Sequence, residues 1–378
     1  MATRPGLAVA AAIVLHGRLL AARRTEPAAL AGSWELPGGK VDTGEDPERA
    51  LVRELGEELD CEVEVLRRLP GEQPLTGGHR LWVYECRLDA GEPQPLEHDA
   101  LRWLAPEELA DVAWLPADQP FVNALRDRLL DGEPMAGGNV GGAVRIGSTV
   151  RRPTGPWTPA VHALLAHLGA AGLDGVPRVL GVDERGREVL TYVPGRVAAQ
   201  DGETVRDVDV QQLGEWLRRY HAAVLEFRPP AVLRWRTVDR PLEAGEIVCH
   251  HDVAPYNAVM DGDRLVGVID WDMAGPGRPL EDLSFAAWNC VPLHADVGAA
   301  ESARRLRLLC SAYGGAEPGA VLAGVVPRIE TAVAKIAAGQ RAGDPGMCNL
   351  AAVGEPERTA KAVARLRVRL PAITAELG

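Results

Sequence analysis

The hydrophobic pattern of the first third of the chain changes from strand-like runs to a helical period and back. Apolar runs bounded by turn residues predict strands at Leu7–Leu15, Leu19–Ala22, Val63–Leu66 and Leu81–Arg87. Amphipathic spacing, with proline at the first turn, predicts helices at Pro47–Leu59, Pro106–Leu109 and Pro120–Leu130. Strands and helices therefore alternate in one α/β unit.

The pattern restarts after a segment rich in glycine and proline, from Asp131 to Gly138. Beyond it, strand-like pieces are predicted at Ala143–Ile146, Thr149–Arg152, Arg178–Val182, Val189–Val193, Ile247–His250 and Leu265–Ile269. A helix is predicted at Pro159–Ala171, and helix dominates beyond Val208. We therefore expect two domains, residues 1–131 and 139–378, with residues 132–138 as the linker.

Composition and charge limit the classes of function. The chain has 378 residues and a net charge of −12, which argues against a nucleic-acid or membrane-surface protein. Residues 1–131 hold 24 Asp and Glu against 14 Lys and Arg, so phosphate binding there would need metal cations. No uncharged apolar run reaches about 18 residues, which argues against a membrane span. Six scattered cysteines without a Cys-x-x-Cys pair favour reduced thiols and a cytoplasmic location.

Three glutamates of the first predicted helix share one face. Glu54, Glu57 and Glu58 stand at positions i, i+3 and i+4, where like charges repel by roughly a few tenths of a kcal/mol per pair. Mg²⁺ or Mn²⁺ would turn this ridge into a cage of hard oxygen ligands. Glu45 could add an oxygen and Arg53 could orient a carboxylate. The alternative is a solvated acidic helix face.

The complete spacing is Gly39-x5-Glu45-x7-Arg53-Glu-Leu-x-Glu-Glu58, and it resembles the signature of the Nudix hydrolases. The resemblance implies a loop–helix–loop that binds divalent metal and cleaves nucleoside diphosphates linked to another moiety. The family's glycine two residues after the glutamate pair is Asp60 in this chain. We interpret this as a small change in helix termination, because no ligand is lost.

Over about residues 5–130 the chain resembles the MutT-like members of that family. Arg23, Arg24 and the stretch Trp34–Lys40 are similar to the phosphate-reading and substrate-facing segment. Glu97 matches an additional metal or base glutamate, and Asp118 matches a base-reading side chain. A solvated turn for Glu97 and a helix N-cap for Asp118 are the alternatives.

The MutT-like resemblance implies a reaction and a set of ligands. A nucleoside triphosphate would give the monophosphate and pyrophosphate, through water activated by two or more metal ions. Either Glu54 or Glu97 would take the proton of that water. The implied metal ligands are Gly39, Glu45, Glu54, Glu57, Glu58 and Glu97.

A second candidate site lies between two apolar strand-like pieces. Asp252 and Asn257 have the spacing of a protein-kinase catalytic loop, in which Asp accepts the substrate hydroxyl's proton and Asn holds Mg²⁺. Asp270, at the end of the next apolar piece, stands where a kinase has its second metal-binding Asp. An ordinary polar turn is the alternative. We expect Asp272 to be a solvated loop carboxylate.

With His250 before it and Ile269-Asp270-Trp271 after it, this segment resembles aminoglycoside-phosphotransferase and choline-kinase-like enzymes, over about residues 137–370. The resemblance implies a two-lobed kinase-like domain with ATP or GTP as the candidate phosphoryl donor. Gly137–Gly142 would form a nucleotide-covering hairpin, and Leu190–Gly195 the hinge between lobes.

Two departures weaken the nucleotide-binding part of that resemblance. Arg151 and Arg152 stand where such enzymes carry a phosphate-binding lysine, and arginine is a planar fork rather than a point charge. The predicted helix Pro159–Ala171 contains no glutamate to pair with that cation, only His162 and His167.

We therefore expect an α/β (α+β) chain, with a Nudix α/β/α sandwich followed by a two-lobed kinase-like domain. The expected function is metal-dependent pyrophosphohydrolysis of a nucleotide, fused to a domain that phosphorylates a small hydroxyl compound. Two alternatives stay open: the phosphotransferase is the main activity, or the C-terminal half is a non-catalytic binding module.

Overall fold

The structure is a computed structural model that describes residues 6–135, 142–199, 203–229, 232–236 and 240–378. The chain divides into two compact units. The first comprises Met1–Met135 and Val144–Val150, and the second Ala136–Ala143 and Arg151–Gly378. None of the described helices is long and apolar enough to cross a membrane.

The first unit is built around one sheet. Its strands are β1 (Leu7–Leu15), β2 (Arg18–Arg24), β3 (Trp34–Glu35), β4 (Glu62–Arg68), β5 (Gln73–Pro74), β6 (Arg80–Ala90) and β7 (His98–Leu104). Its helices are α1 (Pro47–Leu59) and α2 (Gln119–Leu129), with short 3₁₀ turns η1 (Thr76–Gly78) and η2 (Leu109–Asp111). The sheet order is β3-β2-β1-β6-β4, with β5 beside β6 and β7 beside β2. The central strands β1 and β6 are parallel.

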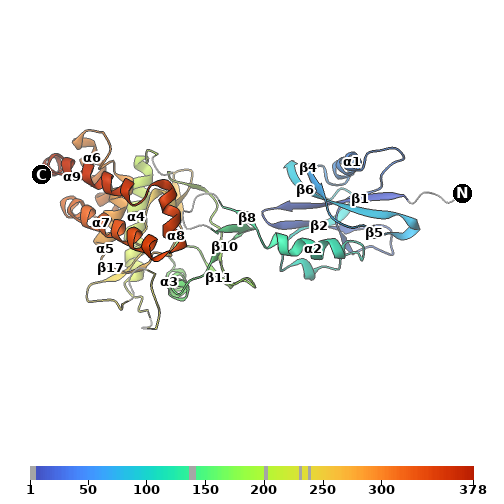
Figure 1. The fold of residues 1–378 in the computed structure, drawn as a ribbon, viewed down its shortest axis with the longest axis horizontal. Helices are drawn as coiled ribbons and strands as arrows, with labels where there is room; N and C mark the ends of the chain where they lie inside the picture. Colours follow the sequence, from blue (N-terminus) through green and yellow to red (C-terminus); the bar gives the residue numbers. More distant parts are fainter. Residues whose placement is uncertain (1–5, 136–141, 200–202, 230–231, 237–239) are drawn as a thin grey trace. The chain divides into compact units, whose positions relative to one another are not determined.

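Alternation along β1 explains why a helix covers each face of the sheet. Successive side chains of a strand point to opposite faces. Val9, Ala11 and Ile13 pack in one cluster with Leu51 and Leu55 of α1. The residues between them pack in a second cluster with the apolar face of α2. Figure 1 shows α1 and α2 on opposite sides of the sheet, and the expected α/β/α sandwich is confirmed.

The helix that carries the glutamates begins and ends as its sequence directs. The side chain of Asp46 accepts from the N–H groups of Glu48 and Arg49, which caps the first turn. Asp60 ends α1 in the left-handed conformation, with φ 51° and ψ 44°, and its N–H donates to Gly56 O. Glycine favours that conformation and Asp tolerates it, so the departure at Asp60 is accommodated at the end of the helix.

The short helix expected at Pro106–Leu109 is wrong. Its residues form a turn in which Glu108 N–H donates to Ala105 O, at 2.9 Å, and the Glu108 carboxylate accepts from Ala105 N–H at 2.8 Å. Four residues are too few to repay the nucleation of an α-helix. The turn leads directly into η2.

Part of the expected linker is ordered within the first unit. β8 (Glu133–Pro134) pairs antiparallel with β9 (Val144–Ile146). The Glu133 carboxylate accepts from His16 N–H at 2.9 Å and lies 2.8 Å from its Nδ1. Residues 136–141, with most of the expected glycine-rich hairpin, lie outside the described residues. The domain boundaries at 131 and 139 stay a prediction.

The second unit combines small sheets with a helical part. Its strands are β10 (Thr149–Pro153, which contains the boundary between the units), β11 (Val179–Val182), β12 (Arg187–Thr191), β13 (Arg196–Val197), β14 (Ile247–Cys249), β15 (Ala258–Asp261), β16 (Arg264–Val268) and β17 (Gly275–Gly277). Its helices are α3 (Thr158–Ala170), α4 (Asp207–Val224), α5 (Pro279–Cys290), α6 (Ala299–Tyr313), α7 (Pro318–Ala342), α8 (Pro345–Asn349) and α9 (Glu357–Leu377), with 3₁₀ turns η3 (Pro255–Asn257) and η4 (Leu350–Val353). β10, β12 and β11 are neighbours in one sheet, β13, β15 and β16 in another, and β14 pairs with β17.

One apolar core joins the strands and helices of the second unit. Trp216 and Tyr220 of α4 stack with ring centroids 5.3 Å apart, and Trp271 packs edge-on against both. Helices α4 and α6, α5 and α7, and α7 and α9 pack in pairs (Figure 1). This core fixes the two segments that hold the second candidate site, the β14–β15 loop and the residues after β16.

Candidate active sites

Arg53 gathers the carboxylates of the first candidate site. Its guanidinium donates to both oxygens of Glu45, each at 3.0 Å, from Nε and Nη2. Its Nη1 donates to Glu54 at 3.0 Å and to Glu57 at 3.3 Å. The hydrogen bond from Arg53 lowers the pKa of Glu45. Arg53 thus contacts three carboxylates, and its orienting role stays a prediction.

The fourth carboxylate is held by the loop before the helix. Gly38 N–H donates to Glu58 Oε2 at 3.2 Å. The pKa of Glu58 is raised to about 7, mainly by burial; the charge of His98 and the Gly38 hydrogen bond lower it, and the charges of Glu35 and Glu54 raise it. A bound cation beside Glu58 would therefore be strongly favoured, because it would stabilise the ionised carboxylate.

Gly39 allows the loop to approach the ridge. A Cβ at this position would lie 2.3 Å from the Glu54 carboxyl carbon, far inside van der Waals contact. The Gly39 carbonyl accepts from Val9 N–H at 2.9 Å and keeps a second lone pair. A side chain at position 39 would therefore have to displace the Glu54 carboxylate.

The donor set suits a hard cation. Carboxylate and carbonyl oxygens are the ligands that Mg²⁺ and Mn²⁺ prefer. The first candidate site offers the carboxylates of Glu54, Glu57, Glu58 and Glu45 and the carbonyl oxygen of Gly39. Within the described residues, no three His, Cys, Asp or Glu side chains already surround a common metal position. Instead, Arg53 and Gly38 hold the carboxylates.

The remaining predicted residues of the first site lie around its edge. Glu97 is exposed just before β7, and its backbone oxygen accepts from the Thr25 hydroxyl at 3.0 Å. Arg23 is paired with Asp99 at 2.6 Å. The Lys40 side chain is exposed, while its backbone oxygen accepts from Arg53 at 3.3 Å. The structure does not bring these side chains into contact with the ridge.

A buried polar cluster adjoins the ridge, and the sequence pointed to only part of it. The Glu35 carboxylate is paired with Arg24 and lies 3.1 Å from His98 Nε2. Asp118 is buried, and burial, followed by the charge of Glu35, raises its pKa to about 8. Its carboxyl is bonded to the backbone of Leu36 and makes no N-cap bond to α2.

His98 was missed in the sequence analysis, and Glu35 lay within the substrate-facing stretch Trp34–Lys40 without being singled out. For Glu35 the available signal was a charged residue between two apolar ones, Trp34 and Leu36. In the structure all three are buried. His98 Nδ1 is also buried, without a hydrogen-bond partner among the described residues. Buried groups of this kind are usually satisfied by a partner or by a ligand.

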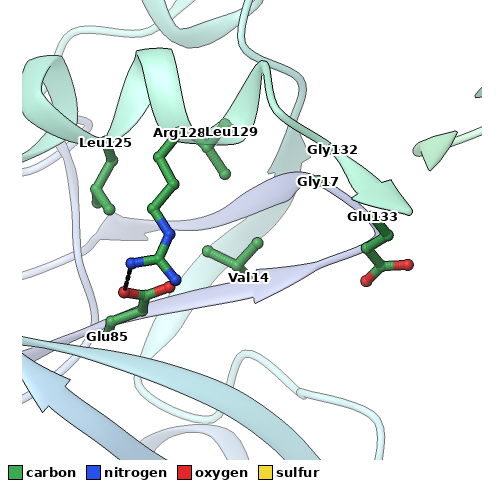
Figure 2. Close-up of a pocket in the computed structure, with 8 residues that line it drawn as sticks. All are labelled: Val14, Gly17, Glu85, Leu125, Arg128, Leu129, Gly132 and Glu133. Atoms are coloured by element: carbon green, nitrogen blue, oxygen red, sulfur yellow. Dashed lines mark hydrogen bonds and ion pairs between the residues drawn. The ribbon is translucent and has the colours of Figure 1, made fainter. Parts of the chain in front are cut away.

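A separate cavity of about 150 Å³ lies on the other face of the sheet (Figure 2). Val14, on the α2 face of β1, lines it together with Leu125 and Leu129 of α2. Glu85 pairs there with Arg128 and, at 2.9 Å, with Arg67. Because α1 covers the opposite face, this cavity is not part of the glutamate site.

The second site brings together the three residues expected from the kinase-like spacing. Asn257 Nδ2 donates to Asp252 Oδ2 at 2.8 Å, and the Tyr256 hydroxyl donates to Oδ1 at 3.2 Å. Ile269 N–H donates to Asn257 O at 2.9 Å, which places Asp270 beside this loop. Burial, followed by the charge of Asp270, raises the pKa of Asp252 to about 8.

Asp282 of α5 holds the loop and was missed in the sequence analysis. It accepts from His250 N–H at 3.0 Å and from His251 N–H at 2.7 Å, and it lies 3.1 Å from His221 Nε2. Burial would raise the pKa of Asp282, but the hydrogen bond and charge of His221 hold it below its usual range. His251 has a left-handed φ of 64°, which these bonds stabilise.

Arg152 finds its carboxylate partners on other elements than α3. It pairs with Glu188 of β12 at 3.4 Å, and Glu188 lies 3.0 Å from His162 of α3. Arg152 also pairs with Asp270 at 3.3 Å and with Asp272 at 2.5 Å. Helix α3 therefore contributes a histidine to this network in place of a glutamate.

Asp272 and Arg151 also belong to the ion pairs around this site. Asp272 is buried between Arg152 and Arg236, the latter at 3.3 Å, so the expectation of a solvated loop carboxylate is wrong. Arg151 pairs with Asp183 at 3.4 Å. Neighbouring residues of a strand point to opposite faces, so Arg152 pairs with Asp270 and Arg151 with Asp183.

The two halves of the chain match two protein families. Residues 4–125 match the NUDIX domain, and residues 228–320 match the phosphotransferase enzyme family. A putative 8-oxo-dGTP diphosphatase 2 of Mycobacterium tuberculosis is 45% identical over 129 residues, 33% of this chain and 91% of that protein. The CTP pyrophosphohydrolase of Escherichia coli is 38% identical over 118 residues, 31% of this chain and 87% of that protein.

A third relative reaches into the second unit. The trifolitoxin immunity protein of Rhizobium leguminosarum is 36% identical over 192 residues, 48% of this chain and 73% of that protein. This match is longer than the first unit, so it includes residues of the second.

Proposed function

We propose a function for each half of the chain, because the chain belongs to the Nudix hydrolases through its first unit and to the phosphotransferase enzyme family through its second. The first unit hydrolyses a nucleoside triphosphate or a related nucleotide to the monophosphate and pyrophosphate. The observation that supports this best is the set of carboxylates that Arg53 gathers on α1.

The residues of the first unit divide the work of this reaction. Bound Mg²⁺ or Mn²⁺ supplies charge neutralisation of the polyphosphate and a water of lowered pKa. Glu54, Glu57 and Glu58 hold the metal, together with Glu45, Glu97 and the Gly39 carbonyl. Arg53 keeps the carboxylates of Glu45 and Glu54 in place, and either Glu54 or Glu97 takes the proton of the attacking water.

The buried cluster beside the ridge reads the base. With its raised pKa, Asp118 stays protonated at neutral pH and can donate a hydrogen bond. The Glu35 carboxylate, paired with Arg24, supplies an acceptor next to it. The relatives named for 8-oxo-dGTP and CTP make an oxidised guanine and a cytosine nucleotide the first substrates to test.

A product analysis tests the proposed hydrolysis. The full chain is incubated with Mg²⁺ and, separately, CTP, 8-oxo-dGTP, dGTP and ATP, and the products are separated by anion exchange. We expect pyrophosphate and the monophosphate from at least one of them, and no product after chelation of the metal. Orthophosphate with the diphosphate as the main products would contradict the proposal.

The second unit transfers a phosphoryl group from ATP or GTP to a small hydroxyl compound. The observation that supports this is the contact of Asp252 with Asn257, beside Asp270. Mg²⁺, which Asn257 and Asp270 would hold, would offset the charge of Asp270 and favour the ionised form of Asp252, which then receives the hydroxyl proton. Arg152 lies where it can meet the phosphates.

Two variants test this second activity. Asp270→Asn is expected to abolish Mg²⁺-dependent nucleotide binding, whereas Asp252→Asn should leave binding and remove transfer. Calorimetry of the full chain carrying Glu57→Gln measures binding without hydrolysis in the first unit. If adding Asp270→Asn to the Glu57→Gln protein leaves nucleotide binding unchanged, the phosphotransferase proposal fails and a non-catalytic binding module takes its place.

A cytoplasmic location fits the state of the thiols. All six cysteines are free, and five of them are buried. Free buried thiols are usual in reducing compartments. We propose the cytoplasm on this ground, and labelling of the free thiols in intact cells checks it.

A further inference from the structure

Helix α7 brings positive charge to the loop that carries Asp252. Arg328 Nη2 donates to His251 O at 2.6 Å, next to Asp252 in the chain. The charge of Arg328 acts on Asp252 and lowers its pKa against the effect of burial. A neutral donor could also bind His251 O, so the positive charge of Arg328 is not needed for that hydrogen bond alone.

The Arg328 guanidinium has donors to spare. Arginine carries five N–H donors, and within the described residues the structure gives this side chain a single hydrogen bond, the one to His251 O. Its Nε is buried without a hydrogen-bond partner in the same part of the chain. One face of the group packs on the Phe285 ring, 4.8 Å from its centroid. The remaining N–H groups of Nη1 and Nη2 can still bind an anion in bidentate fashion.

Lys335 lies on the same face of α7. Seven residues are about two turns, so the side chains of Arg328 and Lys335 project in nearly the same direction, about 10 Å apart along the axis. Lys335 is half-buried and makes no hydrogen bond or ion pair with any residue that the structure describes. Burial, followed by the charge of Arg328, lowers its pKa, so the two cations are close enough to act on one another.

The acidic residues nearby do not neutralise this pair. Glu330 of the same helix is exposed and pairs with Arg367 of α9 at 2.7 Å, away from Arg328. Glu281 is the carboxylate that acts on Lys335, and its Oε1 accepts from Arg278 N–H at 3.0 Å. Among the described residues, neither Glu330 nor Glu281 forms an ion pair with Arg328 or Lys335.

We propose that the acceptor of the second unit carries an anionic group, a carboxylate or a phosphate, which Arg328 and Lys335 bind while its hydroxyl faces Asp252. This inference rests on the phosphotransferase function proposed above. The acceptor oxygen forms a bond to the γ-phosphorus of ATP, the bond from that phosphorus to the β–γ bridging oxygen breaks, and ADP leaves. The hydroxyl proton passes to Asp252.

Four small probes and four proteins test the proposal. The probes are glycerol 3-phosphate, glycerate, neutral glycerol and cationic ethanolamine, and each is titrated by calorimetry with Mg²⁺ and a non-hydrolysable ATP analogue. The proteins are the full chain and its variants Lys335→Met, Lys335→Arg and Lys361→Met. Lys361 is an exposed lysine of α9, so its variant controls for the loss of one surface charge.

We expect glycerol 3-phosphate or glycerate to bind at least tenfold more tightly than glycerol and ethanolamine. Lys335→Met should weaken that binding at least fivefold, while Lys335→Arg and Lys361→Met keep it. The two anionic probes distinguish a phosphate from a carboxylate group. Equal affinity in the wild-type and Lys335→Met proteins, preference for glycerol or ethanolamine, or no binding of either anion at millimolar concentration overturns the proposal.

Transfer itself is followed separately, by ³¹P NMR of the product. If anion binding depends on Lys335 but no phosphorylated acceptor forms, the anion site stands and the phosphotransferase function fails. If transfer occurs to a neutral or cationic acceptor, the function stands and the anion site fails. The two proposals can therefore be judged independently.

Discussion

Replacing Gly39 by alanine should separate activity from stability at the first site. The added Cβ would lie 2.3 Å from the Glu54 carboxyl carbon, whereas an ordinary contact needs about 3.5 Å. The carboxylate must therefore move by roughly 1 Å, which breaks its 3.0 Å hydrogen bond with Arg53. Gly39 is outside the left-handed region, so alanine strains no backbone angle.

A misplacement of about 1 Å can reduce turnover about 100-fold, or about 2.7 kcal/mol in the activation barrier. The free energy of unfolding should change by no more than about 1 kcal/mol, because only the end of one side chain has to move. Pyrophosphate release at saturating Mg²⁺ and a urea titration measure the two quantities.

The matched control is Gly56→Ala, on the exposed side of the same helix. A Cβ at Gly56 would meet no atom within 4 Å, and alanine stabilises a helix interior by up to about 1 kcal/mol relative to glycine. This variant should keep full activity with equal or higher stability. If Gly39→Ala retains activity within threefold of wild type, the position of Glu54 does not matter as we argue.

Three further predictions concern the buried carboxyl groups. The raised pKa of Glu58 means that stability without metal falls as the pH rises from about 4.5 to about 7, since ionisation of Glu58 favours the unfolded state. Glu58→Gln should reduce that slope in urea titrations across this range, and an unchanged slope would argue against the cause. Asp282→Asn should lower the free energy of unfolding, measured by urea titration, by about 3 kcal/mol. The reason is that one buried backbone N–H and His221 lose an ionised partner. A loss below about 1 kcal/mol would mean that the loop does not depend on Asp282. Asp118→Asn should preserve the base preference at pH 7 better than Asp118→Ala, because a protonated carboxyl and an amide can both donate a hydrogen bond. Equal kcat/KM profiles of the two variants over the nucleotide panel would refute this.

Local spacing predicted the parts of the sites that lie within one element. Helix α1 has the predicted bounds, and the i, i+3, i+4 spacing places Glu54 and Glu57 where Arg53 binds both. The Asp252–Asn257 contact follows in the same way from a short loop. That these glutamates hold a metal ion stays a prediction.

Partners that come from distant elements could not be predicted. Glu35 and His98 are 63 residues apart and meet only because β3 and β7 both pair with β2. Arg152 was expected to need a glutamate on α3, but its partner Glu188 comes from the neighbouring strand β12. Sheet pairing decides such contacts, and neither spacing nor composition reports it.

From the sequence alone, the ridge of Glu54, Glu57 and Glu58 was also open to a second interpretation. A solvated acidic face and a metal-binding face have the same spacing. What separates them is the surroundings: Arg53 binds three carboxylates at once, and the backbone of Gly38 binds a fourth whose pKa is raised. A solvated face would leave these groups apart in water.

The most direct test is pyrophosphate release as a function of Mg²⁺ concentration for wild type, Glu57→Gln and Glu48→Gln. Glu48 is an exposed glutamate in the first turn of the same helix, so its variant controls for the loss of one carboxylate from α1. We predict that Glu57→Gln lowers the rate by well over tenfold, about 1.4 kcal/mol in the barrier, and demands more Mg²⁺, while Glu48→Gln behaves as wild type. Equal loss in the two variants, or less than tenfold loss in Glu57→Gln, would show that the ridge is only an acidic surface.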